Sequence, residues 1–80
     1  MKNWVVYLVK CIDGTIYTGI TNDLEKRLKI HNSGKGAKYT KKRIPVVLIK
    51  FFTCESKSDA LKLEYKIKQL SHNEKIKYEQ

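Results

Sequence analysis

The sequence has only two cysteines and one proline, and it has no hydrophobic run long enough to cross a membrane. A membrane-spanning helix needs about 18 apolar residues, whereas the apolar run before Lys10 has six and lacks a cleavage-site pattern. Cys11 and Cys54 lie 43 residues apart without a CxxC motif. We therefore expect no membrane span, signal peptide, disulfide framework or zinc site, and we expect two reduced, buried, strand-borne thiols in a cytoplasmic protein.

Acidic residues are absent from the middle of the chain. The 80 residues leave room for one domain, residues 1–80, with a formal net charge of +9. Nine of the 17 Lys and Arg residues lie between Lys26 and Cys54, where there is no Asp or Glu, and the remaining charges cancel. A concentrated positive charge indicates a polyanionic partner such as a nucleic acid.

Short local signals divide the chain into six elements. Runs of β-branched and aromatic residues indicate strands, and Asp13-Gly14 indicates a turn between the first two. Asn22 and Glu25 have the spacing of an N-terminal capping box, as do Ser71 and Glu74. The predicted elements are strands 4–12, 15–20 and 46–53, a helix from Asn22 to Ser33-Gly34, a helix that begins at Ser56, and a short helix from Ser71. The order ββαβαα predicts a small α/β domain.

Tyr7 and Tyr17 lie on the first two strands, and the hairpin loop decides whether they share a face. With a two-residue loop, Asp13-Gly14, they would point to opposite faces as ordinary strand aromatics. A three-residue loop with a left-handed Gly14 pairs Tyr17 with Val9 instead. Tyr7 then pairs with Gly19, and both hydroxyls lie on one face. We predict the three-residue loop, with Gly19 leaving open space beside Tyr7.

Arg27, His31 and Glu64 are further candidate site residues. Arg27 and His31 are four residues apart on one helix face, and His31 prolongs the apolar stripe of that helix, so we expect it to point toward the sheet. The pair suits either a hydrogen-bonded core histidine beside a solvated arginine or a face that handles phosphate. Glu64 lies on or beside the buried stripe of the second long helix, where a carboxylate must be paired, bound to metal or placed at the rim of a cleft. An i, i+4 ion pair between Glu64 and Lys68 is the competing interpretation.

The loop after the first helix has the composition of a phosphate-binding arm. Basic residues around one aromatic suit a polyanion whose bases can stack, although a solvated basic surface has the same composition. The candidate nucleic-acid-binding residues are Lys35, Lys38, Tyr39, Lys41, Lys42 and Arg43.

Together these residues resemble the GIY-YIG nuclease domain, and in particular its small stand-alone bacterial members. The first motif of that family appears as Val5-Val6-Tyr7 and the second as Tyr17-Thr18-Gly19, followed by the pair Arg27 and His31 and by Glu64. The resemblance covers essentially the whole chain. It implies a three-stranded antiparallel sheet flanked by helices, and metal-dependent hydrolysis of a DNA phosphodiester.

The resemblance also implies a role for each site residue. Glu64 would be the sole protein ligand of Mg²⁺ or Mn²⁺, and Arg27 would neutralise the scissile phosphate. Tyr7 or Tyr17 would deprotonate or orient the attacking water, which requires a nearby cation to lower its pKa from about 10. His31 would serve as a base or a hydrogen-bond relay.

The sequence departs from the family pattern at three places. Val5-Val6 replaces Gly-Ile, Thr18 replaces an apolar residue, and Ile20 stands where excision-repair members carry a lysine; none of these changes removes a proposed catalytic group. Most relatives also carry a separate DNA-binding domain, so here the basic loop or a targeting protein partner would supply that function. We expect a monomeric DNA endonuclease of low sequence specificity, acting in DNA repair or recombination. A non-catalytic DNA- or RNA-binding module is the alternative.

Overall fold

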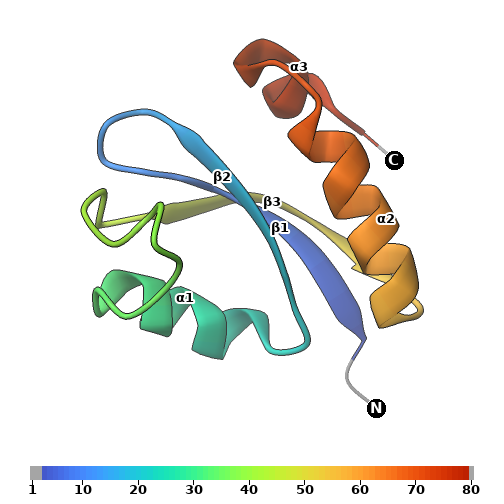
Figure 1. Ribbon diagram of the computed structural model, residues 1–80, viewed down its shortest axis with the longest axis horizontal. Helices are drawn as coiled ribbons and strands as arrows, with labels where there is room; N and C mark the ends of the chain where they lie inside the picture. The colour runs from blue at the N-terminus through green and yellow to red at the C-terminus, as the bar shows by residue number, and fades with distance from the viewer. Residues whose placement is uncertain (1–2, 80) are drawn as a thin grey trace.

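The computed structural model describes residues 3–79 and confirms the α/β fold in the order ββαβαα (Figure 1). Residues 1, 2 and 80 of the predicted domain lie outside the described part. The elements are β1 (Trp4–Lys10), β2 (Ile16–Thr21), α1 (Leu24–Asn32), β3 (Val47–Cys54), α2 (Lys57–Lys68) and α3 (His72–Lys77). None of the helices within 3–79 is long and apolar enough to span a bilayer.

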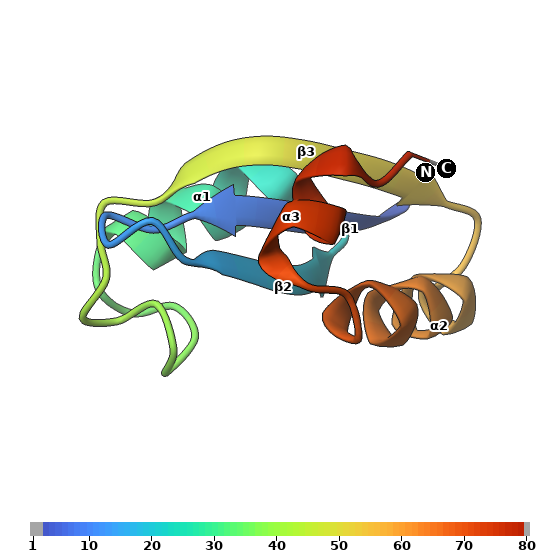
Figure 2. The same ribbon diagram turned by 90° about the horizontal axis from the view of Figure 1, so that it is seen from above.

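Strand β1 is the central strand of the sheet, whose antiparallel strands have the order β2-β1-β3. This position explains its continuous apolar run, because residues 6–9 are each at most 1 % exposed. Val6 and Leu8 pack with residues of α2, whereas Tyr7 and Val9 pack with residues of α1. The sheet therefore lies between two helices, with α2 on one face and α1 on the other (Figure 2).

The hairpin between β1 and β2 has the predicted three-residue loop. The amide of Cys11 donates to the carbonyl of Thr15 at 2.8 Å, and Gly14 has a φ of +86°. Tyr17 pairs with Val9, and Tyr7 pairs with Gly19. The predicted register is confirmed, so the two tyrosines share the face that α1 covers.

Several predicted boundaries are wrong by one or two residues. Asp23, not Asn22, is the N-cap of α1, because its side chain accepts the amide of Lys26 at 3.2 Å while its own amide donates to Thr21 Oγ1. Strand β1 ends before Cys11, so this thiol is not on a strand, although both cysteines are free and buried as expected. The predicted Ser71–Glu74 capping box is confirmed.

Asn32 connects the end of α1 to the start of β3. Its side-chain oxygen accepts the amide of Val46 at 2.7 Å, and its side-chain nitrogen donates to the Val46 carbonyl at 3.2 Å. Val46 lies just outside β3, which begins at Val47, one residue later than predicted. They also close the base of the loop formed by residues 33–46, here called the basic loop.

Replacing Asn32 with Ala should lower the free energy of unfolding by about 1–3 kcal/mol, because two backbone groups lose their partner. Urea denaturation of Asn32→Ala measures this change. Asn73→Ala, at an exposed position of α3, is the matched control and should stay within about 0.5 kcal/mol of the wild type. Equal losses in the two variants would show that Asn32 does not anchor the loop.

Candidate active site

Tyr7 lies at the centre of the candidate site. Only 1 % of its surface is exposed, and its ring extends over the edge strand β2, where a Cβ on Gly19 would lie 2.5 Å from the phenol oxygen. The space expected beside Gly19 is thus filled by the phenol itself. Any larger residue at position 19 would displace the Tyr7 hydroxyl.

Two side chains of α1 contact the Tyr7 hydroxyl. His31 Nε2 lies 2.8 Å from the phenol oxygen, and Arg27 Nε donates to the same oxygen at 3.4 Å. His31 is fully buried, which confirms that it points toward the sheet. The i, i+4 spacing on α1 thus brings both residues to one atom of β1.

Burial shifts the pKa values of Tyr7 and His31 in opposite directions, and both shifts favour the neutral form of the side chain. Burial raises the pKa of Tyr7 above its ordinary 10.0, although the Arg27 hydrogen bond and charge act in the other direction. Burial also lowers the pKa of His31 below 6.5, and the charge of Arg27 adds to this effect. Arg27 therefore does not supply the lowered tyrosine pKa that we expected for Tyr7. The pair is instead a neutral phenol beside a neutral imidazole at pH 7.

Tyr17 joins the site through ring contacts. Its ring centroid lies 6.4 Å from that of Tyr7 and 5.5 Å from that of His31. On its other side it stacks on Tyr39, at 5.9 Å and an interplanar angle of 26°. These four rings, which we call the aromatic cluster, join β1, β2, α1 and the basic loop.

Arg43 and Tyr39 are tied to the protein more closely than the sequence indicates. The Arg43 guanidinium pairs with Asp13 at 2.9 Å, donates to the Tyr39 carbonyl at 2.7 Å and lies 4.2 Å from the centroid of the Tyr39 ring. These contacts connect the basic loop to the β1–β2 hairpin. Arg43 therefore has a structural role beside its predicted contact with nucleic acid.

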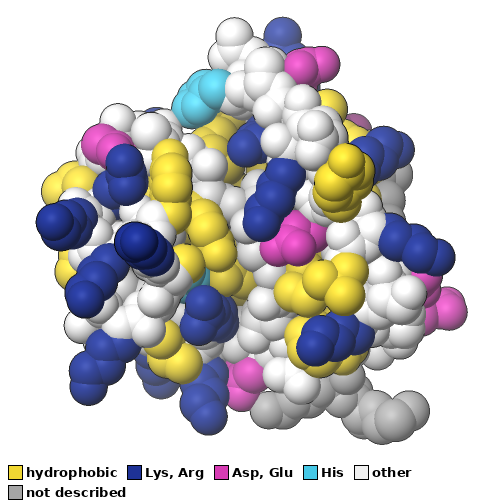
Figure 3. Space-filling view, in the orientation of Figure 1, with side chains coloured by type: hydrophobic (Ala, Val, Ile, Leu, Met, Phe, Trp, Pro, Cys, Tyr) yellow, Lys and Arg dark blue, Asp and Glu magenta, His cyan; other side chains and the backbone are white. Residues whose placement is uncertain are grey.

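The lysines of the basic loop point outward. All four are exposed, and Figure 3 shows Lys and Arg side chains grouped over the half of the molecule formed by α1 and this loop. The four are Lys35, Lys38, Lys41 and Lys42. Their exposure leaves them accessible to a polyanion.

Glu64 approaches the site from α2. Its side chain is 18 % exposed, and Oε2 lies 3.4 Å from Lys68 Nζ, so the competing ion pair does form. Its negative charge is also one of the causes that raise the pKa of Tyr7. Glu64 thus acts on the phenol through its field, whereas Tyr7, Arg27 and His31 are in hydrogen-bonding contact.

The carboxylates around the site suit a divalent cation in one way only. Within residues 3–79, no group of three or more His, Cys, Asp or Glu side chains could hold a metal ion. Glu64 is a largely shielded carboxylate whose charge acts on the phenol, which fits a cation bound through one carboxylate, waters and substrate oxygens. A fully protein-ligated metal site does not fit these residues.

Thr40 belongs to the site and was missed by the sequence analysis. Its hydroxyl oxygen lies 2.8 Å from His31 Nδ1, and the residue is fully buried. No pattern in the sequence indicates that Thr40 is buried while its neighbour Lys41 is exposed. Gly36 is a second such residue, because a Cβ there would collide with the His31 ring.

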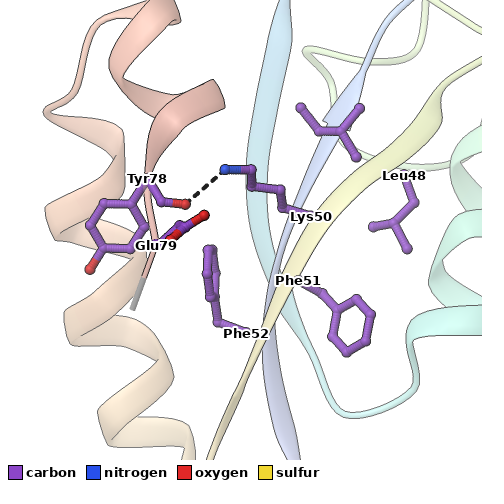
Figure 4. A pocket seen from close by; sticks show the side chains of 7 residues that line it. Leu48, Lys50, Phe51, Phe52, Tyr78 and Glu79 are labelled. Carbon is purple, nitrogen blue, oxygen red and sulfur yellow. Dashed lines mark hydrogen bonds between the residues drawn. The ribbon is translucent and has the colours of Figure 1, made fainter.

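A separate groove lies on the outer side of β3. It has a volume of about 500 Å³ and runs between that strand and the C-terminal segment, where Lys50 Nζ donates to the Tyr78 carbonyl at 2.8 Å (Figure 4). Phe52 packs edge-on against Tyr78, with ring centroids 5.4 Å apart. The groove contains none of the candidate site residues, so we do not assign the chemistry to it.

Comparison with known proteins finds a matching family model and similar sequences. The sequence profile of the GIY-YIG catalytic domain matches residues 3–78. A UPF0213 protein of Staphylococcus haemolyticus is 51 % identical over 96 % of this chain and 94 % of its own length, and one of Halobacterium salinarum is 51 % identical over 88 % and 91 %.

Two solved structures are also similar. The solution structure of a UPF0213 protein from Bacillus halodurans is 45 % identical, with a TM-score of 0.59 over 94 % of this chain and 80 % of that one. A solution structure from E. faecalis is 42 % identical, with a TM-score of 0.68 over 98 % and 83 %. The chain belongs to the GIY-YIG family of nuclease domains.

Proposed function

We propose that this protein is a metal-dependent DNA endonuclease of low sequence specificity that acts in repair or recombination. The observation that carries the proposal is the convergence of Arg27 and His31 on the buried Tyr7 hydroxyl, within the electrostatic reach of Glu64. A cation and a proton acceptor at one polar atom, with a carboxylate whose charge reaches that atom, are parts that phosphodiester hydrolysis can use.

Arg27 binds the scissile phosphate in this proposal. Its Nε contacts Tyr7, so the guanidinium is held beside the phenol. The planar group carries further N–H donors that suit two phosphate oxygens at once. As negative charge develops on the phosphoryl oxygens, a cation already in place stabilises the transition state without reorganisation.

Tyr7 and His31 handle the proton of the attacking water. A phenol with a raised pKa is a poor standing base, but it can accept a proton from water while it passes its own proton to a hydrogen-bonded imidazole. His31 is held neutral by burial and by Arg27, and so is able to take that proton. Tyr17 packs beside the pair and shields it.

Glu64 would hold Mg²⁺ or Mn²⁺ through its carboxylate. The bound ion would polarise the phosphoryl oxygen and stabilise the leaving oxygen. Lys68 competes for the same carboxylate, but its side chain is 47 % exposed, so the pair contributes only about 0.3–0.5 kcal/mol. Such a pair is readily exchanged for a divalent cation.

The exposed lysines of the basic loop bind the DNA backbone. Contacts between lysine and phosphate are independent of sequence, which agrees with low specificity. Selection of a substrate such as branched DNA would come from its shape or from a targeting partner.

One observation favours a second candidate function. Glu64 is already paired with Lys68, and the described residues contain no multi-residue metal cluster. A protein with these features could bind DNA or RNA through the same basic surface without cutting it. Measurement of cleavage decides between the two functions.

With Mg²⁺ or Mn²⁺, the wild type should nick plasmid or branched DNA. Glu64→Gln should cut about 10³-fold more slowly, because it loses the carboxylate charge that holds the ion. Arg27→Ala should lose about 10²-fold or more. Rates are measured from gel-resolved products at saturating protein.

Glu25→Gln is the matched control, because Glu25 also forms an i, i+4 pair with a lysine but is 84 % exposed on α1. It should cut at the wild-type rate. If the wild type binds DNA but never cuts it, the non-catalytic function is correct.

The cleavage rate should fall as the pH decreases through the lowered pKa of His31. His31 accepts a proton only while neutral, so activity is retained above that pKa and lost below it. Arg27, Tyr7, Tyr17 and Thr40 face the imidazole, and of these Arg27 carries the charge that depresses its pKa. The acidic side of the profile of kcat/KM against pH measures this decrease.

His72→Gln changes the exposed second histidine and should leave the acidic decrease in kcat/KM unchanged. A decrease centred at or above the ordinary histidine pKa of 6.5 would contradict the assignment to His31.

Binding should depend on the two lysines next to Thr40. Each phosphate contact adds about −0.9 to the slope of log K against log salt, so the double variant Lys41→Ala/Lys42→Ala should lower its magnitude by about 1.8. Fluorescence anisotropy over a salt series gives the slope. Lys62→Ala/Lys77→Ala removes the same charge from α2 and α3 and should leave the slope unchanged. Equal slopes in both double variants would mean that the basic loop is only a solvated surface.

A further inference from the structure

Thr40 has an unusual environment for a residue in a basic loop. It lies between exposed neighbours, yet none of its surface is accessible to solvent. Its hydroxyl oxygen contacts His31 Nδ1 at 2.8 Å and the Ala37 carbonyl at 3.0 Å. A buried hydroxyl with two partners donates its one proton to one of them and accepts from the other.

The single hydroxyl proton of Thr40 can serve only one partner. The hydroxyl donates to the Ala37 carbonyl at 3.0 Å, and the same carbonyl also accepts the amides of Thr40 and Lys41. Toward the imidazole, Thr40 Oγ1 must then accept, which places a proton on His31 Nδ1. The neutral imidazole has one N–H, so His31 Nε2 is left with a lone pair.

Tyr7 is the next group in this hydrogen-bonded chain. Since His31 Nε2 has a lone pair, the Tyr7 hydroxyl donates to it at 2.8 Å, and the phenol oxygen accepts from Arg27 Nε. Each buried group in the chain then has a partner of the correct kind. In the opposite tautomer, the Tyr7 hydroxyl proton would need another acceptor in a position that is only 1 % exposed.

The basic loop also holds the imidazole ring in place. A Cβ at Gly36 would collide with His31, so the loop backbone packs directly on the ring. The Thr40 amide also donates to the Ala37 carbonyl at 3.0 Å, which ties the hydroxyl to a closed turn. The position of Thr40 Oγ1 relative to His31 Nδ1 is therefore set by backbone structure.

We propose that Thr40 is a positioning residue that fixes the Nδ1–H tautomer of His31 and so directs Nε2 to receive the Tyr7 proton. This inference rests on the proposed endonuclease function. In the reaction, the O–H bond of the attacking water breaks and its proton goes to the phenol oxygen. The water oxygen forms a bond to phosphorus as the bond between phosphorus and the leaving oxygen breaks. The Tyr7 proton moves to Nε2, and the resulting imidazolium keeps its Nδ1–H on Thr40. The leaving oxygen takes a proton from solvent, and the imidazolium releases one.

The tautomer can be measured without DNA or metal. In long-range proton–nitrogen NMR spectra of the protein at pH 7.5, Nδ1 of His31 should show the shift of a protonated ring nitrogen and Nε2 that of an unprotonated one. A wild-type spectrum with the opposite pattern would overturn the proposal, whatever the cleavage assay shows.

Two substitutions at the same site separate positioning from packing. Thr40→Val keeps the shape but removes the acceptor, so the His31 pattern should shift toward the Nε2–H form, and cleavage should fall about 10–100-fold. Thr40→Ser keeps the hydroxyl and should retain the wild-type spectrum and a cleavage rate within a few-fold of it. Thr53→Val, at an exposed position of β3, is the matched control and should change neither readout.

The outcomes distinguish this inference from the proposed function. An unchanged tautomer in folded Thr40→Val, or a Thr40→Ser variant as defective as Thr40→Val, would overturn the role of Thr40 even if the wild type cuts DNA. A correct tautomer in a wild type that never cuts would overturn the endonuclease function instead. If Thr40→Val does not fold, the wild-type and Thr40→Ser spectra still show whether His31 carries its proton on Nδ1.

Discussion

The hydrogen bond between the Tyr7 hydroxyl and His31 Nε2 is the contact on which the rest of the site depends. Both groups are buried between the sheet and α1, where an unpaired polar atom costs about 1–3 kcal/mol. Their pairing fixes how α1 lies on β1 and brings Arg27 to the same atom. Gly19 and Gly36 make the arrangement possible, because a side chain at either position would collide with one of the two rings.

Burial also explains why the site uses neutral groups beside a strong charge. Desolvation holds Tyr7 protonated and His31 deprotonated, and Arg27 reinforces the neutral state of the imidazole. A proton acceptor can then persist at pH 7 a short distance from a cation that binds phosphate. Glu64 adds a negative charge from α2 without replacing either partner. The four groups come from three elements, and the sheet holds them together.

The basic loop serves two purposes along one short segment. Its lysines point outward and carry the positive charge that suits a nucleic acid, whereas Tyr39 and Thr40 pack onto Tyr17 and His31. Arg43 ties the same loop to the hairpin. The lysines that would bind a ligand are therefore close in the chain to Thr40, the residue that orients the imidazole. The surface that attracts DNA and the site that we propose cuts it are parts of one structure.

The sequence by itself determined the element order, the tyrosine register and the inward position of His31, whereas it left the ion pair of Glu64 as one of several alternatives. These features depend on local rules: strand alternation, the left-handed Gly14, and the i, i+4 spacing of helices. The same rules predicted the N-cap of α1 incorrectly, because Asn22 and Asp23 are both good caps and the contact with Thr21 decides between them.

Only the tertiary structure decided which polar groups share a proton. Thr40 reaches His31 across nine positions of chain, and Tyr7 reaches it across 24. No periodicity relates such pairs. Likewise, the direction of the Tyr7 pKa shift depends on how completely α1 and the aromatic cluster exclude water. Residue types and spacing therefore gave the candidates, whereas long-range packing assigned their protonation states, because desolvation and hydrogen bonding depend on the surrounding atoms rather than on the residue itself.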